Sequence, residues 1–176
     1  RIDRVTADVP DGAEALILDL YRRMPSVRIT DMLLEVDAAL GFTDAFTHLR
    51  TGAPCRDRIG LLNVLLAEGL NLGLRKMAEA TNTHDYWQLS RLARWHVESE
   101  AMNQALAIVV AAQGKLPMSR VWGMGTSASS DGQFFPTARH GEAMNMVNAK
   151  YGSVPGLKAY THVSDQFAPF ACQSIP

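Results

Sequence analysis

The chain has 176 residues, and its 17 Lys and Arg residues nearly balance its 18 Asp and Glu residues, which leaves a formal net charge of -1. A composition of 47% hydrophobic and 20% charged residues is typical of a globular protein and excludes a disordered or fibrous chain. The near balance of charge also excludes a long-range field that attracts nucleic acid or an anionic membrane. Any contact with DNA must therefore use a local patch.

The ends and the cysteines of the sequence indicate the setting of the protein. Cys55 and Cys172 lie far apart and in no metal-binding spacing, which favours a reducing, cytoplasmic environment. No apolar run approaches the roughly 18 residues that span a bilayer, so we expect no membrane contact. The sequence opens at Arg1 rather than at Met. We therefore expect it to be an internal fragment of a longer protein.

Helical periodicity dominates the sequence up to about residue 116, where we expect four to six helices. A first helix is predicted over residues 13–24, where Pro25 ends an apolar-rich segment. A second is predicted over residues 30–41, since Thr30 fits an N-cap and Gly41 a C-cap.

The longest apolar pattern follows and predicts one helix over residues 56–80. Gly69 and Gly73 lower the helix propensity there, which suggests that a second helix packs closely against that side. Residues 84–113 are helical again but too long for one ordinary helix, so we expect a break near Ser99.

Beyond Pro117 the apolar period changes to two, which predicts three strands near residues 120–135, 143–151 and 157–165. The turn GSVPG joins the last two strands into a predicted hairpin, and the first strand completes an antiparallel meander. The fold class is therefore α+β, with a helical region over residues 1–116 and a strand region over residues 117–176.

Asp131 stands in the stretch GTSASSDGQFF, and two interpretations of it are open. The carboxylate could bind Mg²⁺, which prefers carboxylate oxygens, while the small neighbours leave room for a phosphate. Alternatively, Asp131 and Gly132 could form a turn, the commoner role of an Asp-Gly pair. Counting by two places Asp131 on the same side of the strand as Ser127 and Ser129.

Asp165 is the second carboxylate of interest, 34 residues after Asp131 at the end of the third predicted strand. It could be a secondary metal ligand, or it could cap a turn before Pro169, which is the commoner role. Arg139 and Lys150 lie in the same region and form either a small phosphate-contacting patch or ordinary surface charge.

Several stretches, in this order, resemble one family, the large replicative transposases of class II bacterial transposons, the Tn-three type. The resemblance runs from about Ile29 to Phe170 and covers most of the chain. The stretches that carry it are ITDMLLEVDAALGFTDAFTHLRTGAP, LLAEGLNLGLRKMAEA, LARWHVESE, SSDGQFF, VNAKYGS and YTHVSDQFAPF.

The resemblance implies a fold and a chemistry. Such transposases are far longer proteins whose RNase H-like catalytic region carries an Asp, Asp, Glu triad that binds two Mg²⁺ ions, with Mn²⁺ as a substitute. The first aspartate of the triad maps onto Asp131, which the resemblance makes a catalytic metal ligand. The other two carboxylates of the family lie beyond Pro176. The small residues around Asp131 then leave room for the metals and a DNA phosphate.

One departure from the family concerns the segment just before the hydroxyl run. The family usually has Gly-Asp-Gly there, whereas this sequence has Gly123, Met124 and Gly125. An acidic side chain is thus missing seven positions before Asp131.

The first hypothesis is therefore part of a DNA transposase that acts on double-stranded DNA in the bacterial cytoplasm, at the nucleoid. Ser127, Ser129, Ser130, Arg139 and Lys150 are the candidate DNA contacts. With one carboxylate of the triad the fragment should be inactive, and Mg²⁺-dependent nicking that Asp131→Ala abolishes would overturn this. The alternative is a helical scaffold or interaction module of a nucleoprotein assembly. In either case we expect self-association through an exposed strand edge.

Overall fold

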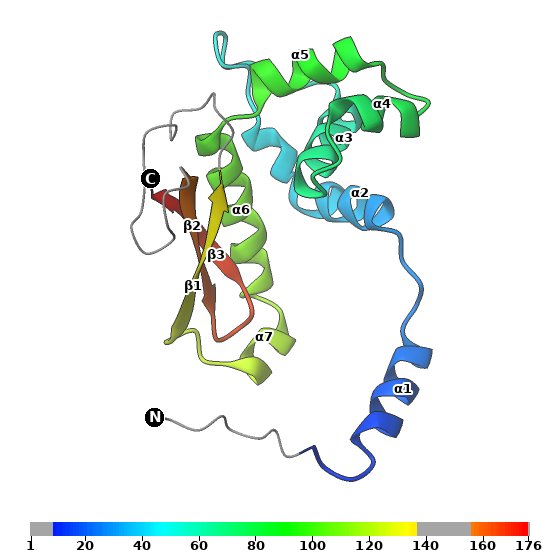
Figure 1. Cartoon of the computed structure of the whole chain (residues 1–176), viewed down its shortest axis with the longest axis vertical. Coiled ribbons are helices and arrows are strands. Elements are labelled where there is room, and N and C mark those ends of the chain that lie inside the picture. The colour runs from blue at the N-terminus through cyan, green and yellow to red at the C-terminus, as the bar shows by residue number, and fades with distance from the viewer. Residues whose placement is uncertain (1–8, 137–155, 176) are drawn as a thin grey trace. The chain divides into compact units, whose positions relative to one another are not determined.

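The computed structural model describes residues 9–136 and 156–175. The chain divides into two compact units, Arg1–Glu35 and Val36–Pro176. Helices make up most of the chain up to Trp122, and a three-stranded sheet follows (Figure 1). The α+β class predicted from the sequence is therefore confirmed.

The first two helices lie close to their predicted ranges. Helix α1 (Ala13–Arg23) begins after Gly12, whose φ of 82° is left-handed, and it has no buried residue. Helix α2 (Ile29–Leu40) contains the boundary between the two units. The N-cap predicted at Thr30 is wrong, because α2 already begins at Ile29 and Thr30 lies inside the helix. Gly41 ends α2 with a φ of 65°, and its N–H donates to the carbonyl of Asp37 at 2.7 Å, so the predicted C-cap is correct.

The remaining helices belong to the second unit. They are the 3₁₀ helix η1 (Phe42–Ala45), α3 (Arg58–Gly69), α4 (Leu74–Ala80), α5 (Tyr86–His96), α6 (Ser99–Gln113) and α7 (Pro117–Trp122). In the described residues, six α-helices begin before residue 116, within the predicted range. The break expected near Ser99 falls between α5 and α6.

The single helix predicted over residues 56–80 is wrong, because the chain breaks between α3 and α4. Asn71 and Gly73 adopt φ values of 52° and 78°, which an α-helix cannot contain. Apart from α3 itself, no described residue has an atom within 4 Å of the position where a Cβ on Gly69 would stand, so that glycine does not allow a close helix contact. Gly73 instead permits the break, because glycine adopts a positive φ without strain.

A small apolar core joins these helices. Helices α3, α4 and α5 pack on one another, and η1 packs on α3 and α6. The largest fully buried side chains there are Phe46, Leu61, Leu89, Val64 and Thr43.

Asp37 is a buried charge beside this core, with 5% of its surface exposed. Its carboxylate accepts from the backbone N–H of Thr43 at 2.9 Å, from the Thr43 hydroxyl at 3.0 Å and from Arg58 Nη1 at 3.0 Å. The other guanidinium nitrogen of Arg58, Nη2, binds Asp44. The end of α2 is thereby fastened to η1 and to the start of α3.

The sheet contains strands β1 (Ala128–Pro136), β2 (Gly156–Ser164) and β3 (Pro169–Ile175). Their order is β1-β2-β3, and both pairings are antiparallel, with an irregularity between His162 and Val163. Helix α6 runs beside the sheet and contacts β3 (Figure 1).

The strand predictions are correct in part. β2 matches the strand predicted near residues 157–165, but β1 starts only at Ala128, because residues 117–122 form α7. The neighbours of β2 are β1 and β3, so the predicted hairpin between residues 143–151 and 157–165 is not the pairing that forms. Residues 143–151 themselves lie outside the described residues. β3 was not predicted. In the described part of the chain, every helix is too short or too polar to cross a bilayer.

Candidate active site

Asp131 lies in the interior of β1 and not in a turn. It stands opposite Thr161 of β2 in a continuous antiparallel register. Its side chain is exposed, and Oδ1 accepts from the backbone N–H of Gly132 at 2.8 Å. The turn interpretation of the Asp-Gly pair is therefore wrong, and the strand presents the carboxylate to solvent.

One face of the sheet gathers polar side chains around Asp131. Ser129 and Gln133 share this face because side chains alternate along a strand. Directly paired residues also share a face, so Thr161 of β2 and then Cys172 of β3 continue the row from Asp131. The Thr161 hydroxyl lies 4.0 Å from the Cys172 sulfur. No sequence pattern pointed to Thr161, because only the strand register places it beside Asp131.

The opposite face of β1 is partly covered by its own sheet. A Cβ on Gly132 would lie 2.5 Å from Lys158 Cε and 2.8 Å from Tyr160 Cε1, so these two side chains lie over the glycine. Lys158 Nζ is 4.5 Å from the centre of the Tyr160 ring. Ser130 belongs to this face, opposite His162, and is not on the face of Asp131.

Asp165 anchors the loop that leads into β1. Its Oδ1 accepts from the backbone N–H of Gly125 at 2.9 Å, and its Oδ2 accepts from the Ser127 hydroxyl at 3.1 Å. Its own N–H donates to the Ser127 carbonyl at 3.0 Å. Both carboxylate oxygens are thus engaged in the loop, and so is the hydroxyl of Ser127, one of the candidate DNA contacts.

Neighbouring residues tighten this anchor. A Cβ on Gly123 would lie 2.4 Å from Cγ of Asp165, so only glycine fits at that position without a shift. Gln166 Nε2 donates to the Gly123 carbonyl at 3.0 Å, and Gln113 of α6 donates to the Gln166 carbonyl at 3.1 Å. The loop before β1, the turn after β2 and the end of α6 therefore form one connected network.

The hydrogen bonds set the charge state of Asp165. Partial removal from water by itself raises the pKa of this carboxyl. The bonds from the Ser127 hydroxyl and from the backbone N–H groups of Gly125, Ser127 and Thr126 outweigh that effect and bring the pKa below the ordinary value of 3.8. Asp165 is therefore ionised whenever the loop is in place near neutral pH.

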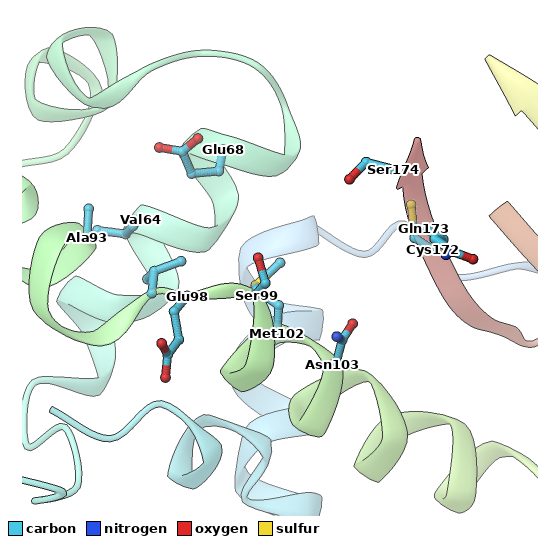
Figure 2. A pocket seen from close by; sticks show the side chains of 11 residues that line it. Val64, Glu68, Ala93, Glu98, Ser99, Met102, Asn103, Cys172, Gln173 and Ser174 are labelled. Atoms are coloured by element: carbon cyan, nitrogen blue, oxygen red, sulfur yellow. The ribbon is translucent and has the colours of Figure 1, made fainter. Parts of the chain in front are cut away.

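A cavity of about 720 Å³ lies between β3, α3 and the start of α6 (Figure 2), at the end of the row where Cys172 stands. Cys172 and Ser174 line one side of it, and Met102 and Asn103 line the other. Asp131 does not line this cavity, whose charged residues are Glu68 and Glu98. Within the described residues no group of three or more His, Cys, Asp or Glu side chains lies close enough to hold a metal ion. Arg139 and Lys150 fall outside the described residues.

A model of the Tn3 transposase DDE domain matches residues 31–176 of the chain. The chain belongs to this family. It is 45% identical over 175 residues to the transposase for transposon Tn3926 of Escherichia coli and 44% identical over 175 residues to that for Tn501 of Pseudomonas aeruginosa. It is 37% identical over 177 residues to the transposase for Tn1546 of Enterococcus faecium.

These matches cover nearly the whole chain but a small part of each relative. They include 99%, 99% and 98% of the chain and 18% of each of the three transposases. The chain therefore spans under a fifth of the length of these Tn3 family relatives. The matched residues 31–176 include β1 and Asp131, so the open polar face of the sheet lies inside the DDE domain.

Proposed function

We propose that the chain supplies Asp131 as the first metal-binding carboxylate of a DDE transposase, which cleaves and joins DNA strands at transposon ends in the bacterial cytoplasm. The observation that carries this proposal is the position of Asp131, exposed in the interior of β1 within the family match. The other two carboxylates of the triad would belong to the part of the intact protein that this chain does not span. The RNase H-like sheet of that protein would continue from β1.

Asp131 provides one carboxylate ligand for a metal ion and does not form a complete metal site by itself. Oδ1 accepts the Gly132 N–H, and no described residue is bonded to Oδ2. A carboxylate oxygen suits Mg²⁺ or Mn²⁺. In the intact protein, two such ions would lower the pKa of an attacking hydroxyl and offset charge that develops on the phosphate. One carboxylate cannot hold two ions, so we propose that this chain alone is inactive.

The hydroxyls on the same face as Asp131 support a phosphate contact. Ser129 and Thr161 are exposed and can donate to a phosphate oxygen next to the carboxylate. Ser130 faces the other side, and Ser127 is held by Asp165. We therefore assign the serine contact to Ser129. Arg139 and Lys150 remain proposed contacts to the DNA backbone.

The assignment of Asp131 predicts where Mn²⁺ will bind. In an NMR titration, paramagnetic broadening by Mn²⁺ should be strongest at the amides of Gly132 and Thr161. Asp131→Asn should abolish it, because an amide oxygen carries no charge to attract the ion. Glu79→Gln removes another exposed carboxylate and should leave the pattern unchanged. Broadening that persists around Gly132 in the Asp131 variant would contradict the assignment.

We also propose that the chain associates with itself through β1. In the described residues β1 pairs only with β2, so among these residues no strand pairs with the backbone groups along the other edge of β1, where a second copy could add a strand. Light scattering after size exclusion should show a dimer at high protein concentration. Gln133→Lys places a charge on this edge strand and should shift the protein toward monomer. A monodisperse monomer at every concentration would refute self-association.

A further inference from the structure

Helix α5 presents an unusual exposed face, outside the site described above. Trp87, Arg91, Arg94 and Trp95 recur at helical spacing and form one stripe, and all four are exposed. Trp87 is 77% exposed and Trp95 36%. On the other side of the helix Leu89 and Leu92 are buried, which fixes the stripe toward solvent. We call these four residues the basic face of α5.

The two arginines of the basic face have no acidic partner in the described part of the chain. Arg23 and Arg58 form ion pairs, whereas Arg91 and Arg94 form none with any described residue. The helix itself contains no Asp or Glu. Two unneutralised guanidinium groups therefore stand together on a protein whose net charge is -1.

A short loop steadies the C-terminal end of the basic face. The ring of His48 stacks on Trp95, with 5.1 Å between centroids and 9° between planes. The backbone N–H of Leu49 donates to the Trp95 carbonyl at 2.8 Å, and that of Arg50 donates to His48 Nδ1 at 3.2 Å. The His48 ring thus packs on the indole, and the loop brings a third exposed cation, Arg50, to this end of α5.

We propose that the basic face of α5 binds the sugar-phosphate backbone of duplex DNA. Guanidinium groups match the oxygens of a phosphate in a bidentate manner, and indole N–H groups donate to the same acceptors. Trp87 and Trp95 are eight residues apart, about 12 Å along the helix, which is close to the width of the major groove. The cavity beside β3 is unsuitable for phosphate, because its charged residues are Glu68 and Glu98.

This inference rests on the proposed function only in taking DNA as the partner. It requires no metal, since the attraction is between arginine and phosphate. A binding experiment in EDTA therefore tests it independently of Asp131. If Asp131 fails to bind Mn²⁺ while DNA binding depends on α5, the proposed catalytic role is wrong and the DNA contact stands.

The test is fluorescence anisotropy of a labelled duplex of random sequence, titrated with the whole chain in EDTA at several salt concentrations. The variant Arg91→Gln/Arg94→Gln should weaken binding about tenfold or more at moderate salt. It should also reduce the slope of log K against log salt by about 1.8, since each lost phosphate contact removes about 0.9.

The control variant Lys115→Gln/Arg120→Gln removes the same charge from exposed positions outside α5 and should bind as the wild type does. Unchanged circular dichroism and melting of both variants would show that they fold. The proposal is overturned if the wild type does not bind the duplex, if both variants lose affinity equally, or if the protein binds anionic phospholipid vesicles and not DNA.

Discussion

Asp37→Ala should lower the free energy of unfolding of the Val36–Pro176 unit by about 2–3 kcal/mol. The change leaves the buried N–H of Thr43 without an acceptor and removes the buried partner of Arg58. Arg58 is 46% exposed, so water compensates part of its loss, which keeps the value below that of a fully buried pair. Urea denaturation followed by circular dichroism measures the change.

Asp44→Ala is the matched control, because Asp44 binds the same guanidinium from a side chain that is 62% exposed. Exposed ion pairs contribute little, so the loss should be under about 1 kcal/mol. Equal losses for the two variants would mean that the pairing with Arg58, and not the bonds to Thr43, carries the effect.

Asp165→Ala should release the loop before β1. The variant lacks the acceptors for the Gly125 N–H and the Ser127 hydroxyl, so protection of the Gly125 amide from hydrogen exchange should be lost. Asp131→Ala removes a carboxylate from the same sheet that has no bond to this loop, and it should leave Gly125 protected. Retained protection in the Asp165 variant would mean that the glutamine bonds alone hold the loop.

The anchor should also depend on pH, with a defined sign. The pKa of Asp165 is lower in the folded protein than its ordinary value of 3.8. A group of this kind contributes its full stabilisation above the ordinary value and loses it as the pH falls through the folded pKa. An NMR titration should therefore show the Gly125 amide shifting with a midpoint below 3.8 in the wild type, and no such step in Asp165→Ala.

Local sequence signals predicted a helix boundary correctly where a capping residue marked it. Gly41 ended α2 as expected, and the long pattern after residue 84 divided before Ser99. The pattern over residues 56–80 predicted one helix wrongly, because the apolar spacing continues through a segment where Asn71 and Gly73 adopt positive φ angles. Pro117 stands at the first position of α7, where proline favours a helix start, although the sequence there was predicted to begin a strand region.

The candidate site was predictable only along one strand. Counting by two placed Ser129 beside Asp131, and it could equally have placed Ser130 on the other face. Thr161 and Cys172 join the row through pairing between strands, which depends on register and not on sequence distance. The hydrogen bond between Asp165 and Gly125 joins residues 40 positions apart. It forms only because the fold brings the turn after β2 against the loop before β1, which no local pattern predicts.

The row of Asp131, Thr161 and Cys172 gives the protein a natural attachment point for a spectroscopic label. Cys55 is buried, and burial raises the pKa of its thiol, so it reacts slowly with a maleimide. Cys172 is exposed, and these are the two cysteines of the sequence. A dye would therefore couple selectively at Cys172, two strands from Asp131, and report on that face without any added cysteine.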